Sequence, residues 1–335
     1  MALARLPLSA RKPFFENDET RAIRSLLETL GLRTVCKSAR CPNRSECYSS
    51  RALTFMILGD TCTRNCRFCS VAKGVPENVE PAEPSRIAHA ARTLGLEFVT
   101  ATSVTRDDLA DGGAAHFVAC VVEIRRTFAL LGIEVLVPDF GGDTSLSSLV
   151  LDAGPDVFCH NVETVPRLYR DVRPGASYVR SLRILEAASR HSSRVVVKSG
   201  LMVGLGETEE EVIATLRDLR NVGCRSVTIG QYLRPARECL PVSEYVPPER
   251  LSAYEETCRG LGFGAAQVGT FVRSSYKARE MWRKINGNHY SKQEFHCDAG
   301  RKELHRGETA ETREVLAQDH RSSSDVLPGA VQEHR

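Results

Sequence analysis

The sequence of 335 residues lacks several features that would place it in other classes of protein. It has no run of eighteen apolar residues, so no segment is expected to span a membrane. Its net charge is only +3, which is too small to indicate nucleic-acid binding. The first residues, MALARLPLSARKPFF, have no continuous apolar core of the signal-peptide kind and resemble a transit peptide only weakly. We therefore expect a cytoplasmic protein, and a mitochondrial location is less favoured.

Cysteine, in contrast, occurs twelve times. Without a secretory signal, this number indicates a reducing compartment, where thiols bind metals or take part in catalysis more often than they form disulfides. Apolar residues make up 42% and charged residues 26% of the chain, which suits one large globular domain.

The middle of the chain alternates between β-branched runs and amphipathic segments. Six βα units in succession predict either a parallel sheet or a full or partial barrel. The capping-box spacing of Thr208 and Glu211 supports a helix start at this point. The expected strands are Leu53–Leu58, Phe98–Ser103, Ile133–Val137, Asp156–Asn161, Arg194–Ser199 and Ser226–Gly230. The expected helices are Pro84–Leu94, Ala114–Leu131, Ser177–Ser189 and Glu207–Asn221.

Polar clusters follow the expected strands, at the end where parallel α/β folds bind ligands. They are a cysteine loop and the stretches TSVTRDD, PDFGGD, HNVET and KSG. We therefore assign residues 51–285 to the barrel and residues 1–50 to an N-terminal extension. Residues 286–335 are polar and lack periodicity, and we expect this tail to be disordered.

The cysteine loop GDTCTRNCRFCSVAKG contains Cys62, Cys66 and Cys69 but no fourth cysteine. A structural zinc site needs four ligands, usually in two short pairs, and only Cys66 and Cys69 form such a pair. Three thiols also cannot all pair as disulfides. A cubane iron–sulfur cluster would keep one of its four irons open, and that iron could bind a substrate or a cofactor.

The stretch CTRNCRFC resembles the signature of the radical S-adenosylmethionine enzymes, whose fold is a complete or partial (β/α) barrel. The resemblance implies a partial (β/α)6-type TIM barrel of the radical SAM type. It also implies a [4Fe–4S] cluster on these three cysteines, with adenosylmethionine chelating the fourth iron. Phe68 matches the family's aromatic residue near the adenine, and a packed loop aromatic is the alternative interpretation.

A second triplet, Cys36, Cys41 and Cys47, lies upstream in VCKSARCPNRSECYSS. Alone it is ambiguous, because a zinc knuckle that borrows a histidine and three unrelated buried cysteines are both possible. Its position ahead of the radical SAM motif resembles the lipoyl synthase family. There the triplet binds an auxiliary [4Fe–4S] cluster, completed by a serine of a C-terminal RSSY motif. The resemblance assigns that role to Ser275 in Arg273-Ser274-Ser275-Tyr276.

Further similarity to the family extends over residues 36–276, including KSGLMVGLGET and TIGQYLRP. It implies that Asn161, Glu163 and Lys198 line the adenosylmethionine pocket, and strand-end caps or ion pairs are the alternative. Gly204 and Gly206 are expected to let the backbone approach the cofactor. Two residues depart from the family pattern: Cys159 replaces a usual asparagine, and Lys277 replaces the histidine that commonly follows RSSY. His160, beside Asn161, is also a candidate residue of the pocket. The remaining cysteines lack ligand spacing: Cys120, Cys224, Cys239, Cys258 and Cys297.

The resemblance implies radical insertion of two sulfur atoms at C6 and C8 of an octanoyl-lysine, with adenosylmethionine and a sacrificial auxiliary cluster. The implied partners are octanoylated lipoyl carrier domains, an electron donor and an iron–sulfur carrier. Two alternatives are kept. The first is another radical SAM sulfur-inserting enzyme, such as a methylthiotransferase or a biotin-synthase-like protein. The second is a non-catalytic zinc or electron-transfer module, for which so long a βα array is unnecessary.

Overall fold

A computed structural model describes residues 7 and 10–286 of the chain, and all of them belong to one compact unit, residues 1–291. In this part of the chain, one parallel sheet has the strand order β1-β4-β5-β6-β7-β8-β9. Its strands are β1 (Thr54–Ile57), β4 (Phe98–Ser103), β5 (Gly132–Leu136), β6 (Val157–Cys159), β7 (Val196–Val203), β8 (Ser226–Gln231) and β9 (Ala265–Gly269). A short parallel pair, β2 (Thr61–Cys62) with β3 (Ala72–Lys73), frames the cysteine loop.

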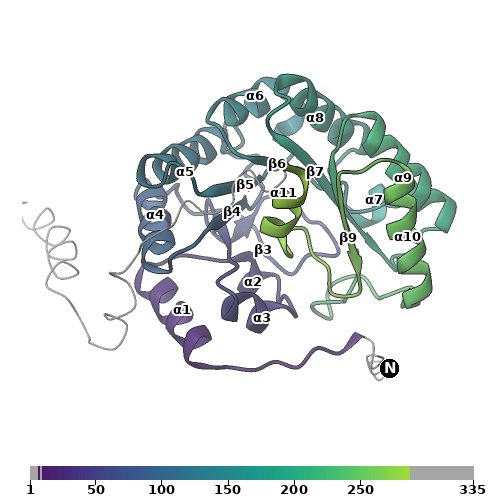
Figure 1. Cartoon of the computed structure of the whole chain (residues 1–335), viewed down its shortest axis with the longest axis horizontal. Helices are drawn as coiled ribbons and strands as arrows, with labels where there is room; N and C mark the ends of the chain where they lie inside the picture. The colour runs from purple at the N-terminus through teal and green to yellow at the C-terminus, as the bar shows by residue number, and fades with distance from the viewer. Residues whose placement is uncertain (1–6, 8–9, 287–335) are drawn as a thin grey trace, which may run out of the picture. The chain divides into compact units, whose positions relative to one another are not determined.

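Helices follow the strands and cover the outer side of the curved sheet (Figure 1). These are α4 (Glu83–Thr93), α5 (Ala114–Thr127), α6 (Thr144–Asp152), α8 (Tyr178–His191), α9 (Glu209–Asn221) and α10 (Pro248–Gly260). The N-terminal extension contributes α1 (Asp18–Thr29), α2 (Val35–Ser38) and α3 (Arg44–Ser49). The short turns η2 (Phe140–Gly142), η3 (Pro166–Leu168) and α7 (Tyr169–Val172) precede larger helices, and α11 (Ala278–Asn286) ends the described chain.

The partial-barrel prediction is confirmed, because the sheet is all parallel and every expected strand and helix is present within a few residues. The capping box at Thr208 also exists, with Glu211 bonding back to the backbone. Strand β9 was not expected from the sequence. None of the described helices is long and apolar enough to cross a membrane. The tail that we expect to be disordered lies, from residue 287 onward, outside the residues that the structure describes.

The strands have two chemically different faces. On the outer face, Val99 and Ile133 belong to the main hydrophobic core that packs against the helices. On the concave face, Thr100, Thr102 and Thr228 line a cavity. Side chains alternate between the two faces of a strand, so the register of a strand determines both which residues face the core and which face the cavity.

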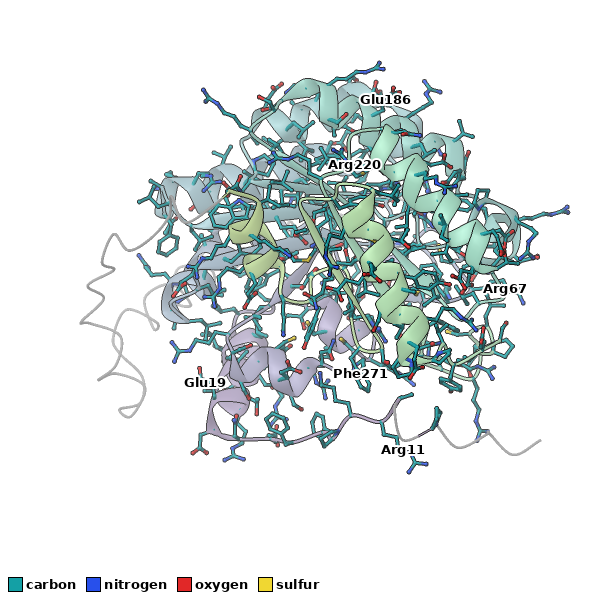
Figure 2. All side chains as sticks on the ribbon, turned by 45° about the vertical axis from the view of Figure 1, so that its right-hand side comes forward. Arg11, Glu19, Arg67, Glu186, Arg220 and Phe271 are labelled. Atoms are coloured by element: carbon teal, nitrogen blue, oxygen red, sulfur yellow. The ribbon has the colours of Figure 1, made fainter. Side chains whose placement is uncertain are left out.

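The C-terminal segment closes the concave side. From α11, Ala278 and Trp282 pack against Phe98, Val157 and Val196, whose side chains are at or near the starts of their strands. Figure 2 shows Phe271, which precedes α11, beside the N-terminal helices. The segment that precedes α11 is therefore held against the N-terminal extension, where the Asn43 amide donates to the Phe271 carbonyl.

Candidate active site

A cavity of about 1170 Å³ opens at the carboxyl ends of the strands and extends to the N-terminal extension. It brings together segments that are far apart in the sequence. Most of the residues predicted for the site line it: Cys36, Cys41, Cys47, Cys62, Cys66, Cys69, Phe68, Asn161, Glu163 and Ser275.

The downstream thiols lie in a loop held by backbone contacts. The Cys62 sulfur accepts hydrogen bonds from the backbone N–H groups of Arg64 and Thr105, both at 3.4 Å. Burial, together with smaller contributions from Cys66 and Cys62, raises the pKa of Cys69 to about 12. Burial also raises the pKa of Cys66. Cysteine binds a metal as its thiolate, so a bound cluster has to stabilise the negative charge that burial disfavours when no metal is present.

The upstream thiols lie on and beside the short helices α2 and α3. Burial raises the pKa of both Cys36 and Cys47 to about 12, and the other thiols of this triplet contribute. No group of three or more His, Cys, Asp or Glu in the described part of the chain is arranged to hold a single metal ion. The donor chemistry fits iron–sulfur clusters, because each set offers three soft thiols to one cavity.

The RSSY segment reaches this cavity from the opposite end of the chain. The Val272 carbonyl passes so close to Gly230 that a Cβ at position 230 would stand only 2.1 Å from its oxygen. The hydroxyl of Ser274 donates a 3.0 Å hydrogen bond to Asn161 and lies 3.5 Å from the sulfur of Cys159. Among the described residues, the Ser275 hydroxyl has no hydrogen bond, and Ser275 lines the cavity.

Asn161 and Glu163 lie at the end of β6. The Asn161 amide donates to the Glu163 carboxylate at 3.0 Å. Glu163 has φ 65°, and its backbone bonds on both sides to the β7 edge, at Gly200 and Met202. Burial raises the pKa of Glu163, and Arg173 offsets part of that rise. A side chain at Gly200 would come within 3.0 Å of the Asn161 amide, so the KSG glycine leaves room for it.

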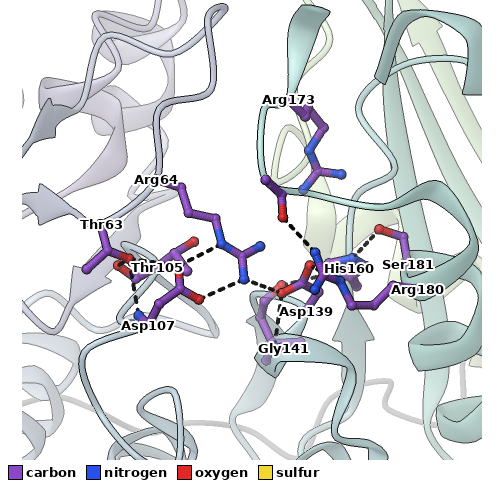
Figure 3. A network of polar contacts seen from close by, with 12 residues as sticks. Thr63, Arg64, Thr105, Asp107, Asp139, Gly141, His160, Arg173, Arg180 and Ser181 are labelled. Atoms are coloured by element: carbon purple, nitrogen blue, oxygen red, sulfur yellow. Dashed lines mark hydrogen bonds and ion pairs between the residues drawn. The ribbon is translucent and has the colours of Figure 1, made fainter. Parts of the chain in front are cut away.

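A polar network supports the cavity wall (Figure 3). Arg64, within the cysteine loop, pairs with Asp107 and Asp139, both at 2.7 Å. Burial alone would raise the pKa of Asp139, but Arg64 holds it below its usual range. His160 lines the cavity, yet both ring nitrogens are bonded, at 2.9 Å each, to Val137 and Ser181. Burial lowers the pKa of His160 to about 4, so it is a neutral supporting residue.

Comparison with known proteins supplies the family. Residues 56–219 match the model of the radical SAM superfamily. A lipoyl synthase of Caldanaerobacter subterraneus subsp. tengcongensis is 51% identical over 262 residues, covering 78% of this chain and 92% of the relative. A lipoyl synthase of Methylococcus capsulatus is also 51% identical, covering 78% of this chain and 81% of the relative. The chain belongs to the lipoyl synthase family.

Solved structures support the same fold. The hydrogenase maturase HydG of Carboxydothermus hydrogenoformans superposes with a TM-score of 0.51 at 15% identity, covering 69% of this chain and 56% of that one. This similarity concerns the fold alone. It agrees with the parallel sheet and with the radical SAM match.

Lys198 does not lie where the family resemblance led us to expect. Its ammonium group is 2.8 Å from the Glu134 carboxylate, and both side chains are only 1% exposed. Lys198 does not line the cavity. The prediction that it binds the adenosylmethionine carboxylate is therefore withdrawn, and the alternative interpretation as an ion pair holds.

Gly204 and Gly206 also differ from expectation. Gly204 packs against Gln231 and the Glu244 carbonyl, where a Cβ would come within 2.4 Å of both. Neither glycine lines the cavity. Their positive φ angles, 95° and 110°, serve the turn between β7 and α9.

Arg173 is a cavity residue that the sequence reasoning missed in this member of the lipoyl synthase family. Its guanidinium donates to the Asn161 carbonyl at 2.9 Å and to the Tyr169 hydroxyl at 3.1 Å. It lines the cavity beside Glu163 and Cys66. It lies in the stretch LYRDVRPG, within the residues 36–276 that resemble the family, and this resemblance was the available signal. Four cysteines without ligand spacing are buried in the structure: Cys120, Cys224, Cys239 and Cys258. Cys297 lies outside the described residues.

Proposed function

We propose that the protein is a lipoyl synthase that inserts sulfur at C6 and C8 of an octanoyl group carried on a lysine of another protein. One observation carries this proposal: two separate cysteine triplets and Ser275 line a single cavity. An enzyme that only generated a radical would need one triplet. A second triplet in the same cavity suits a source of sulfur placed beside the site of radical formation.

Two ligand sets follow from this arrangement. Cys62, Cys66 and Cys69 would hold the radical SAM [4Fe–4S] cluster. The auxiliary [4Fe–4S] cluster would be held by Cys36, Cys41, Cys47 and Ser275. When bound, the first cluster supplies the electron that cleaves adenosylmethionine for hydrogen abstraction, and the second supplies the two sulfur atoms.

The chain itself binds, orients and excludes water. Asn161 and Glu163 offer an amide and a carboxylate for the ribose hydroxyls of adenosylmethionine, and Phe68 offers a ring near the adenine. Arg173 fixes the backbone at Asn161 and contributes the positive charge that Lys198 does not. Unactivated C–H bonds resist acid–base chemistry, so positioning the correct carbon in an enclosed space is the protein's main task.

The substrates in this proposal are octanoylated lipoyl carrier domains, such as the E2 subunits of 2-oxoacid dehydrogenases and the H protein of the glycine cleavage system. Two adenosylmethionine molecules would be used for each lipoyl group. An electron donor and an iron–sulfur carrier that rebuilds the auxiliary cluster complete the set of partners. We place the reaction in the cytoplasm.

The decisive experiment is anaerobic incubation of the reconstituted protein with an octanoylated carrier peptide, adenosylmethionine and reductant. Mass measurement should show gain of two sulfurs without loss of hydrogen while the product is the reduced dithiol, and a further loss of two hydrogens after oxidation in air to the cyclic disulfide. Ser275→Ala should reduce lipoyl formation at least tenfold while 5′-deoxyadenosine production continues, whereas Cys62→Ala should abolish both. Ser252→Ala, on the exposed side of α10, is the matched control and should behave as the original protein. Full lipoyl activity of Ser275→Ala would contradict the ligand assignment.

Metal analysis separates the alternatives. About eight irons per chain correspond to two four-iron clusters, and about four correspond to a radical enzyme with a single cluster. Zinc without iron would indicate the non-catalytic module. A sulfur-inserting enzyme of another kind would leave the octanoyl peptide unchanged.

A further inference from the structure

Three segments of the chain meet in one polar cluster beside the cavity. We define it by its members: Lys12, Asn43, Glu46, Phe271 and Tyr276. The ammonium group of Lys12 donates to Asn43 Oδ1 at 2.6 Å and pairs with the Glu46 carboxylate. It also lies 5.2 Å from the centre of the Phe271 ring and 5.4 Å from that of Tyr276. The Tyr276 hydroxyl donates to Glu46 Oε1 at 2.9 Å.

The cluster joins chain segments that are far apart in the sequence. Glu46 and Tyr276 are separated by 230 residues, and the Asn43 amide donates to the Phe271 carbonyl, 228 residues away, at 2.6 Å. Asn43 is only 1% exposed, so its amide is committed to these contacts. Each contact fixes the N-terminal segment or the segment 271–276 to the stretch between Cys41 and Cys47.

The location of the cluster relates it to the ligand set. Glu46 directly precedes Cys47, and Tyr276 directly follows Ser275. A hydrogen bond between these two side chains therefore sets how far the serine stands from the upstream thiols. The Ser275 hydroxyl has no hydrogen bond of its own among the described residues, so its neighbours determine its position.

We propose that Lys12, Glu46 and Tyr276 are positioning residues that hold Ser275 against the upstream cysteine triplet, so that its hydroxyl remains a ligand until sulfur is transferred. This rests on the proposed function for the identity of the bound group. A hydroxyl is a weaker ligand of iron than a thiolate, so it needs placement by its surroundings. Lys12 serves by holding Glu46, whose other carboxylate oxygen receives Tyr276.

The test compares Tyr276→Phe with Tyr245→Phe. The first keeps the ring over which Lys12 lies and removes only the hydroxyl; the second removes a hydroxyl outside the cavity and is the control. In the full-length apoprotein, amide hydrogen exchange of residues 270–277 should be about tenfold faster in Tyr276→Phe and unchanged in Tyr245→Phe. This measurement does not depend on the reaction. Unchanged exchange in Tyr276→Phe would overturn the proposal.

In the reconstituted Tyr276→Phe protein, the iron of the auxiliary cluster, about half of the total, should be lost to a chelator several-fold faster than in the original protein. The rate of 5′-deoxyadenosine formation should stay within about twofold of the original. The ratio of lipoyl product to deoxyadenosine should fall. Adding Ser275→Cys should restore iron retention, because a thiolate holds iron without such placement. A merely structural role would speed loss of both clusters and would not respond to Ser275→Cys, and either result would overturn the proposal. If the exchange result holds but no octanoyl peptide is converted by the original protein, the proposed function fails and the positioning stands.

Discussion

Replacement of Lys198 by methionine tests the clearest disagreement between the family resemblance and the structure. Lys198 on β7 and Glu134 on β5 form an ion pair inside the sheet, with both side chains almost fully buried. In the described part of the chain, the second carboxylate oxygen of Glu134 has no hydrogen-bond partner. Lys198→Met therefore leaves a buried carboxylate without its compensating charge.

The expected loss of stability is large. Removing one partner of a buried pair typically costs about 3–5 kcal/mol, whereas replacing both with apolar residues of similar volume is often neutral. Lys198→Met alone should therefore lower the free energy of unfolding by about 3–5 kcal/mol, and Glu134→Leu with Lys198→Met should recover most of it. The pair acts through charge, so the two substitutions should be strongly non-additive.

The loss should depend on pH with a defined sign. Burial raises the pKa of Glu134, and Lys198 offsets part of that rise. Without Lys198, the folded-state pKa lies further above the unfolded value of about 4.3. The penalty is absent below that value and grows by about 1.4 kcal/mol per pH unit until the folded-state pKa is reached. The single variant should therefore regain stability as the pH falls, and the double variant should not.

The assay is anaerobic urea unfolding followed by the fluorescence of Trp282, the only tryptophan of the chain, which packs against Phe98 near the base of the sheet. The KM for adenosylmethionine of the double variant should stay within about twofold of the original. If Lys198 instead bound the cofactor carboxylate, loss of a charged hydrogen bond of about 1.5–3 kcal/mol would raise that KM at least tenfold. A tenfold rise in the KM of a stable double variant would refute the reasoning.

Two further predictions concern the cavity. Gly230→Ala introduces a Cβ 2.1 Å from the Val272 oxygen, so the RSSY segment must shift; lipoyl formation should fall at least tenfold while 5′-deoxyadenosine formation keeps more than half its rate, and an equal fall of both would contradict this. Arg173→Met removes the bonds to the Asn161 carbonyl and the Tyr169 hydroxyl, so the KM for adenosylmethionine should rise about tenfold with iron content unchanged. Recovery of most of the affinity by Arg173→Lys would show that the charge matters, and an unchanged KM for Arg173→Met would exclude the role.

Local sequence signals predicted much of the fold. Strand β4 is rich in β-branched and aromatic residues and was placed without error. Strand β9, Ala265–Gly269, has one β-branched residue in AAQVG, so its own sequence does not identify it. It forms because β8 offers a free edge and α10 returns the chain beside it. Tertiary pairing therefore decided what propensity could not.

The site divides in the same way. Spacing along the chain identified the two cysteine triplets that line the cavity, because the members of each triplet are close in sequence. The partner of Lys198 could not be found like this, since Glu134 is 64 residues away and meets it across an intervening strand. Arg173 acts through backbone carbonyls, which carry no residue identity in the sequence. The structure was needed wherever one partner of a contact is a backbone group or lies far away in the sequence.

The sequence of the strands, as well as that of the loops, indicates the cavity. A parallel sheet covered on both faces normally reads as a continuous apolar run, and a filled barrel packs its interior with branched apolar side chains. Strand β4, FVTATS, alternates instead: Val99 packs outward, while Thr100 and Thr102 face the cavity. At the base, Phe98 is apolar and meets Trp282 at a ring distance of 5.8 Å. On β4 the concave face is therefore apolar at Phe98, which packs against Trp282, and polar at Thr100 and Thr102, so the polar lining lies toward the carboxyl end of this strand.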